Sequence, residues 1–154
     1  FVYVYFMTSL TEIPAAVKNF MKEVGIPETL VADPHPNHKD QKVRSFCLEV
    51  GTKLRLLEES TQWANFCERI IGILKESTRK DIREVDAPMI FWCYAMERRV
   101  AIMNLTSKNN FKLRGVNPYT VTFGETADIS NICHFGFMEW CYYRDNTEGY
   151  PNMR

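Results

Sequence analysis

The chain has 154 residues, 45% hydrophobic and 13% aromatic, which is enough to build one ordinary domain core and excludes a disordered or collagen-like segment. Nineteen basic and nineteen acidic side chains give zero formal net charge, so any nucleic-acid role must rest on local patches rather than on a global attraction. No apolar run is long enough to span a membrane, and five scattered cysteines suit buried, reduced thiols in an intracellular protein without disulfides.

The first part of the chain predicts strand, helix and strand. Phe1–Met7 alternates and is rich in β-branched and aromatic residues, which predicts a strand. Apolar residues at three- and four-residue steps predict an amphipathic helix over Glu12–Val24, with Thr11 as its N-cap. Thr29–Ala32 is a short β-prone run, and the prolines after Asp33 stop it, so Asp33 is expected at the carboxyl end of a strand.

The middle of the chain continues the alternation. A second helix is expected over Val43–Val50 and a short strand over Lys53–Leu57. A long helical pattern follows from Trp63 to Val85, and a further helix is expected through Met89–Leu105, with Pro88 in its first turn. This order of elements predicts an α/β domain with parallel strand pairings.

The last part of the chain is less regular. Its pattern weakens after the second long helix and ends in an aromatic stretch, Phe135–Tyr143, which predicts a final strand. We therefore expect a core over 1–107 and a tail segment with a C-terminal strand over 108–154.

One side of the long helix is expected to be polar. At about 100° per residue, Gly72, Lys75 and Arg79 fall within about 40° of Glu68. The helix should therefore show its partners a carboxylate followed by two cations. The expected buried side is roughly opposite and consists of Phe66, Ile70, Ile73, Leu74 and Ser77.

Two acids and two sequence blocks carry a family resemblance. Asp33 at a strand end and Glu68 at a helix start are separated by 68 − 33 − 1 = 34 residues. The segment Gln62–Lys75 contains Asn65, Glu68 and Arg69 as an Asn-x-x-Glu-Arg motif, and a second block covers Asn117–Ser130. The spacing and the first block resemble the Asp-Asp-Glu core of retroviral and retrotransposon integrases, and the second block resembles the stretch after the core in copia-like elements.

This resemblance implies a fold and a chemistry. It implies an RNase H-like mixed sheet with flanking helices, missing its first two strands, with Phe1–Met7 as the third. It implies a polynucleotidyl transferase that processes and joins DNA 3′ ends with two Mg²⁺ (or Mn²⁺) ions, for which Asp33 and Glu68 would be ligands. Lys75, Arg79 and Asn65 would be the DNA-binding residues.

The resemblance also implies binding partners, and the sequence differs from the family pattern in two respects. The partners would be element-end DNA and target DNA, with homo-oligomers of the full-length protein, no membrane, and residence in the nucleus or a cytoplasmic particle. The family's first acid would lie on a strand upstream, so we expect an N-terminally truncated fragment, inactive alone, with two of three catalytic acids. The family usually follows its second acid with glycine or asparagine and then glycine, whereas Asp33 is followed by Pro34, His35 and Pro36, and proline stiffens the loop.

Simpler interpretations stay open for each residue. Asp33 could be a turn former, Glu68 could stabilise a helix N-terminus, and Lys75 and Arg79 could form a solvated face with i,i+4 pairs. Alternative functions are another RNase H-like nuclease or transposase, which lacks the block at Asn117–Ser130, and a non-catalytic remnant that acts as a binding module. A doubly wound small-molecule enzyme would need a glycine-rich phosphate loop, and the sequence has none.

Overall fold

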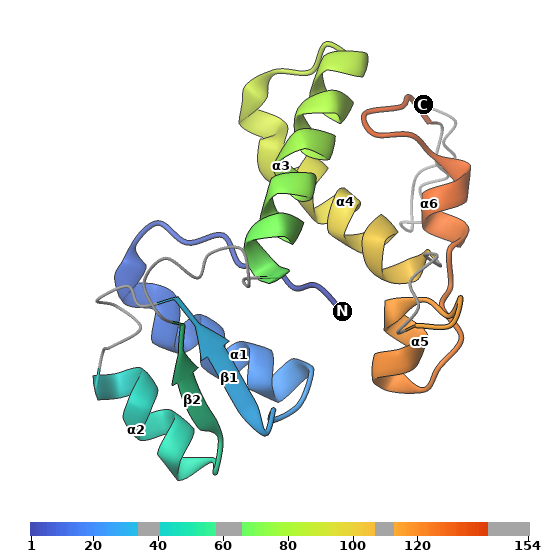
Figure 1. The fold of residues 1–154 in the computed structure, drawn as a ribbon. Helices are drawn as coiled ribbons and strands as arrows, with labels where there is room; N and C mark the ends of the chain where they lie inside the picture. Colours follow the sequence, from blue (N-terminus) through green and yellow to red (C-terminus); the bar gives the residue numbers. More distant parts are fainter. Residues whose placement is uncertain (34–40, 58–65, 107–112, 142–154) are drawn as a thin grey trace, which may run out of the picture. The chain divides into compact units, whose positions relative to one another are not determined.

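The computed structural model describes residues 1–33, 41–57, 66–106 and 113–141. The chain divides into two compact units, Phe1–Glu76 and Ser77–Arg154, and the boundary between them falls inside helix α3 (Phe66–Glu84) (Figure 1). The boundary predicted from the sequence, between 107 and 108, stays a prediction.

The opening segment Phe1–Met7 is not a strand, so that prediction was wrong. A strand requires hydrogen bonds to a neighbour, and an alternating pattern cannot by itself supply one; the sheet of the described residues has two strands, both later in the chain. The aromatic side chains pack instead. The ring of Tyr3 stacks on Tyr5, with 4.9 Å between centroids, and meets Phe20 edge-on at 6.3 Å.

Helix α1 (Ile13–Glu23) begins after a single 3₁₀ turn, η1 (Leu10–Glu12). The cap of that turn is Ser9, whose hydroxyl accepts a hydrogen bond from the backbone N–H of Thr11, 3.3 Å away. In return the carboxylate of Glu12 accepts from the backbone N–H of Ser9 at 2.9 Å, which completes a capping box. The predicted cap, Thr11, was therefore wrong: Ser9 caps the 3₁₀ turn, and the N-cap position of α1 itself is Glu12, without a side-chain hydrogen bond.

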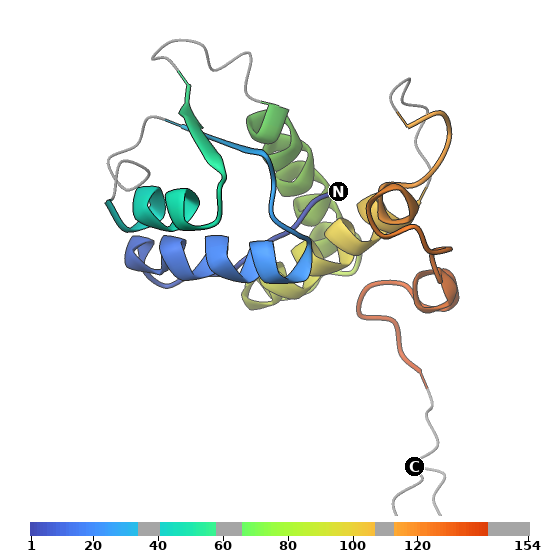
Figure 2. The ribbon, with the colours of Figure 1, turned by 90° about the horizontal axis from the view of Figure 1, so that it is seen from below.

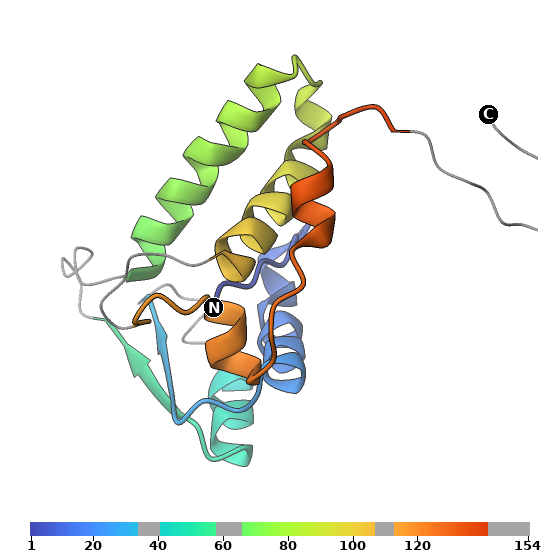
Figure 3. The same cartoon turned by 90° about the vertical axis from the view of Figure 1, so that its right-hand side faces the viewer.

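The sheet of the first unit is a parallel pair. Strand β1 (Thr29–Ala32) lies beside β2 (Lys53–Leu56), with helix α2 (Gln41–Glu49) between them in the chain. Both predicted strands are confirmed, the second being one residue shorter than Lys53–Leu57. Helices α1 and α2 cover the same face of this pair (Figures 2 and 3). The opposite face carries Val31 and the charged residues of β2, which are exposed.

The core of the first unit lies between these two helices and the sheet. Val43 and Cys47 on α2 are 2% and 1% exposed, and burial of a side chain of the size of Val43 stabilises the fold by roughly 1.5–3 kcal/mol. Burial also raises the pKa of the Cys47 thiol. Ile13 and Met21 complete the buried cluster, and partly buried residues pack around it: Val17, Phe20, Leu30, Phe46, Val50 and Leu54.

The cysteines are free thiols, as expected, but most are not buried. Cys47 is buried and Cys93 is partly buried, whereas Cys67, Cys133 and Cys141 are exposed. The expectation of buried thiols therefore holds for Cys47 and was wrong for the exposed three.

The second unit begins with a helical hairpin (Figure 3). The long helix expected over Trp63–Val85 is α3 (Phe66–Glu84), and 63–65 lie outside the described residues. The helix expected through Met89–Leu105 is a 3₁₀ turn, η4 (Met89–Phe91), followed by α4 (Trp92–Leu105). Within the described ranges no helix combines the length and apolar character needed to cross a bilayer.

Two short helices follow the hairpin. Helix α5 (Pro118–Phe123) contacts α4 and is capped by Asn117, whose side-chain oxygen accepts a hydrogen bond from the backbone N–H of Thr120 at 2.8 Å. Gly124 ends it at a φ of 75°, the left-handed conformation that glycine adopts without strain. Helix α6 (Ser130–His134) comes next.

The final strand predicted over Phe135–Tyr143 is absent from its described part, 135–141, and 142–143 lie outside the described residues. The chain turns there instead: Met138 has a φ of 57°, and the backbone N–H of Gly136 donates to the carboxylate of Glu139 at 2.5 Å. The aromatic residues of this stretch are typical of a strand, which is why a strand was predicted. The segment forms a turn instead, because no strand of the described part pairs with it.

Candidate functional site

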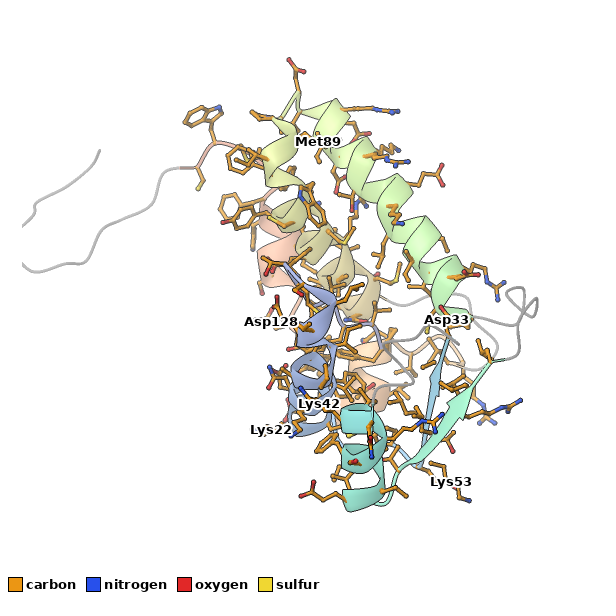
Figure 4. The ribbon with its side chains drawn as sticks, turned by 90° about the vertical axis from the view of Figure 1, so that its left-hand side faces the viewer. Lys22, Asp33, Lys42, Lys53, Met89 and Asp128 are labelled. Atoms are coloured by element: carbon orange, nitrogen blue, oxygen red, sulfur yellow. The ribbon has the colours of Figure 1, made fainter. Side chains whose placement is uncertain are left out.

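Asp33 lies at the carboxyl edge of the parallel pair. It follows the last residue of β1 and is exposed, and Figure 4 shows it at the end of the sheet opposite Lys53. The backbone N–H of Leu57 donates to the carbonyl of Ala32 at 2.9 Å, so strand pairing continues to the residue before Asp33. Ligands of open α/β sheets bind beyond the carboxyl ends of the strands. The strand-end position predicted for Asp33 is confirmed, while its role as a ligand stays a prediction.

A hollow of about 530 Å³ in the first unit lies elsewhere, between α2 and β2. Its lining does not include Asp33 and consists of Arg44, Cys47, Leu48, Gly51, Thr52, Lys53, Leu54 and Leu56. Asp33 is therefore not part of this hollow, and its position is defined by the carboxyl edge of the sheet.

Glu68 is the third residue of α3 and is exposed in the first turn of that helix. An acidic side chain there interacts favourably with the helix dipole, so this position suits both first-turn stabilisation and ligand binding. Asn65, the first residue of the Asn-x-x-Glu-Arg motif, and the proline-containing stretch 34–36 lie outside the described residues.

The polar side of α3 is exposed as the sequence predicts. All four of its residues are exposed: Glu68, Gly72, Lys75 and Arg79. The nearest i,i+4 neighbours of Lys75 are Ile71 and Arg79, and those of Arg79 are Lys75 and Arg83, so neither cation has an acid four residues away. Within the described ranges neither forms an ion pair. The i,i+4 pairing considered for these two residues is therefore wrong, although their role in DNA binding is untested.

The buried side of α3 differs from the prediction. Phe66 and Ile73 were expected to be buried and are 58% and 46% exposed. Leu74 is buried as predicted, at 3% exposure. The buried residues of α3 also include Ile82 and two polar residues, Thr78 and Asp81, which a hydrophobic pattern cannot identify.

Asp81 joins α3 to α4 and was not found from the sequence. Its side chain is 4% exposed and accepts two hydrogen bonds from Arg99, one from Nε at 2.5 Å and a short one from Nη2. Nη1 of Arg98 lies 3.9 Å from the same carboxylate, and Nη2 of Arg98 donates to the carbonyl of Phe135 at 3.3 Å. A buried carboxylate needs such partners, so this cluster is a structural clamp between the helices.

The donor chemistry of the two candidate acids suits a hard divalent cation, because carboxylate oxygens are preferred ligands of Mg²⁺. A two-metal site of the integrase type uses three acids. In the part of the chain that the structure describes, no group of three or more His, Cys, Asp or Glu side chains is placed to hold a metal. Asp33 and Glu68 thus fit the kind of ligand required, but the described residues do not by themselves assemble a complete two-metal centre.

Comparison with known proteins finds the fold but not a sequence family. No protein-family model matches the chain, and no curated protein matches it. Among solved structures, the HTLV-2 integrase catalytic core domain in complex with magnesium, in a trimeric form, superposes with a TM-score of 0.58 at 20% identity, covering 74% of this chain and 70% of that one. The dimeric form of the same domain gives 0.58 at 18% identity, covering 80% and 75%.

These similarities show the fold. The chain is a mixed α/β protein with the fold of a retroviral-type integrase catalytic core, as the resemblance in the sequence implies. At such identities the likeness does not by itself carry over a metal, a DNA substrate or an oligomeric state.

Proposed function

We propose that the chain is part of a retrotransposon (copia-like) integrase core of RNase H-like organisation that acts on DNA in DNA integration. The observation that carries the proposal is the occurrence, within an integrase-core fold, of an aspartate directly after β1 and a glutamate in the first turn of α3. The sequence motif around Glu68 supports the same assignment. Another RNase H-like nuclease or transposase would share the acids, but it would lack the block at Asn117–Ser130.

Each candidate residue then has a defined task. Asp33 and Glu68 would hold Mg²⁺ or Mn²⁺, which when bound neutralises phosphate charge and favours a hydroxyl nucleophile. Lys75 and Arg79 would contact phosphates of the DNA end, and Asn65 would contribute a hydrogen bond beside them. Neither carboxylate is assigned proton transfer.

DNA joining of this kind needs a third carboxylate, which the matched motifs do not supply. We therefore expect the chain alone to bind divalent metal and DNA without joining DNA ends. Strand-transfer activity of the isolated chain with Mg²⁺ would contradict this expectation.

The metal role is tested by Mn²⁺ binding, followed by electron paramagnetic resonance on the wild type, Asp33→Asn and Glu68→Gln. Each substitution is expected to weaken Mn²⁺ binding by roughly tenfold or more, because each removes one of few charged ligands. Glu76→Gln is the matched control, because Glu76 is an equally exposed acid on α3 outside the predicted pair. Equal Mn²⁺ binding by the wild type and both variants would refute the metal role.

Partners follow from the same proposal. We expect DNA ends and target DNA as ligands, self-association of the full-length protein, and residence in the nucleus or a cytoplasmic particle. The dimeric and trimeric forms of the HTLV-2 core support self-association. Light scattering after size-exclusion chromatography measures it directly, and a strictly monomeric full-length protein would count against it.

A further inference from the structure

Arg83 continues the line of cations on α3 beyond the two residues expected from the sequence. Lys75, Arg79 and Arg83 are separated by four residues each and are all exposed on one continuous helix. Four residues advance about 6 Å along a helix and 40° around it. The three side chains therefore form a line about 12 Å long within an arc of about 80°.

Among the described residues, no acid of α3 forms an ion pair with this line, although Glu76 lies three residues before Arg79. Lys80, three residues before Arg83, has Glu84 four residues later and pairs with it at 3.6 Å. No such pair forms for Lys75, Arg79 or Arg83 among the described residues. Like charges at i,i+4 repel one another, so the line is unfavourable in the free protein and an external anion would relieve it.

A regular line of cations fits a regular polyanion. A cation in the last turn of a helix interacts favourably with the helix C-terminus, and this explains Arg83 taken alone. It does not explain Arg79 and Lys75, which lie about one and two turns earlier. Phosphates follow one another at a constant step along a nucleic-acid strand, which a regular line of cations can match.

We infer that Arg83 is a third phosphate-contacting residue and that α3 follows the backbone of duplex DNA through Lys75, Arg79 and Arg83. The inference rests on the proposed function, which assigns the first two of these residues to DNA. It adds Arg83 and a direction, because the line runs away from Glu68 toward the C-terminal end of α3.

The test is binding of the full chain to a fluorescein-labelled DNA duplex, measured by anisotropy at several salt concentrations. Each phosphate contact contributes about 0.9 to the slope of log affinity against log salt. Arg83→Gln is expected to lower that slope by about 0.9, which corresponds to roughly eightfold weaker binding at about 0.1 M salt. Arg83→Lys keeps the charge and should keep the slope.

Lys80→Gln is the matched control, because it also removes one positive charge from α3 but at a residue already paired with Glu84. The inference is overturned if Arg83→Gln leaves the salt slope unchanged, or changes it only as much as Lys80→Gln does. In either case the proposed function still stands if Arg79→Gln lowers the slope. Absence of duplex binding by the wild type overturns both. Thermal melting followed by circular dichroism checks that each variant is folded, and a role confined to the helix end would change melting but not the salt slope.

Discussion

Replacing Asp81 with alanine should destabilise the second unit more than any change of an exposed charge on the same helix. The Asp81 side chain is 4% exposed and is held by Arg99 through two hydrogen bonds, with Arg98 3.9 Å away. Removal of the carboxylate leaves two guanidinium groups beside an apolar interior without their partner. It also removes the ion pairs by which Asp81 links α3 to α4.

The size of the loss follows from the burial of the three side chains. Breaking a buried ion pair by removing one partner costs about 3–5 kcal/mol. Arg98 and Arg99 are each 26% exposed and recover part of their hydration, so we expect the lower end, about 3 kcal/mol. For a chain of this size that corresponds to a fall in melting temperature of about 6–12 °C.

Urea unfolding of the wild type, Asp81→Ala, Arg99→Ala and the double variant gives both the loss and the coupling between the two residues. Glu84→Gln is the control, because its pair with Lys80 is 3.6 Å long and its side chains are 57% and 70% exposed, so we expect less than about 0.5 kcal/mol. A loss for Asp81→Ala below about 1 kcal/mol, or no larger than for Glu84→Gln, would show that the clamp is not a stabilising element.

Three further predictions concern the described parts of the chain. Val43→Ala should destabilise the first unit by about 2 kcal/mol in urea unfolding, because Val43 is 2% exposed in the core; a loss under about 0.5 kcal/mol would contradict the packing. Asn117→Ala should cost about 1 kcal/mol and speed hydrogen exchange of the Thr120 amide, which unchanged exchange would disprove. Hydrogen bonds from the Thr8 side chain and then the Ser9 backbone lower the pKa of Glu12 below 4.5, so its contribution to stability is present above pH 4.5 and is lost as the pH falls through the lower, folded pKa. The difference in melting temperature between wild type and Glu12→Gln should therefore shrink at acid pH; a constant difference would exclude this linkage.

The short strands could be predicted from the sequence because each is bounded by clear breakers. Thr29–Ala32 stops before the prolines that follow Asp33, and the next strand starts after Gly51, so local chemistry and the fold agree. Phe1–Met7 is also β-prone in composition but has no strand partner in the described residues, and strand formation depends on such a partner. The same reason accounts for the wrong strand over 135–141.

The candidate site was predictable in its polar part only. Exposure of Lys75 and Arg79 follows from helical periodicity, which is a property of the local sequence. The burial of Asp81 depends on Arg99, eighteen residues away on another helix, and no periodic pattern reports such a pair. For the same reason Phe66 was predicted to be buried but is exposed. A hydrophobic pattern shows which face of a helix is apolar, but not whether another element packs against that face.

Helix α3 is one continuous helix from Phe66 to Glu84, and this fixes the angles among the side chains along it. The angle between the side chains of Glu68 and Arg79 is set by the number of residues that separate them along the helix. Insertion or deletion of a single residue between them would rotate Arg79 by about 100° around the axis and shift it about 1.5 Å, without altering either residue. The eleven-residue interval between the carboxylate and this cation (79 − 68 = 11) therefore sets the angle between their side chains around the helix axis. Insertions and deletions in this interval should be tolerated far less well than substitutions.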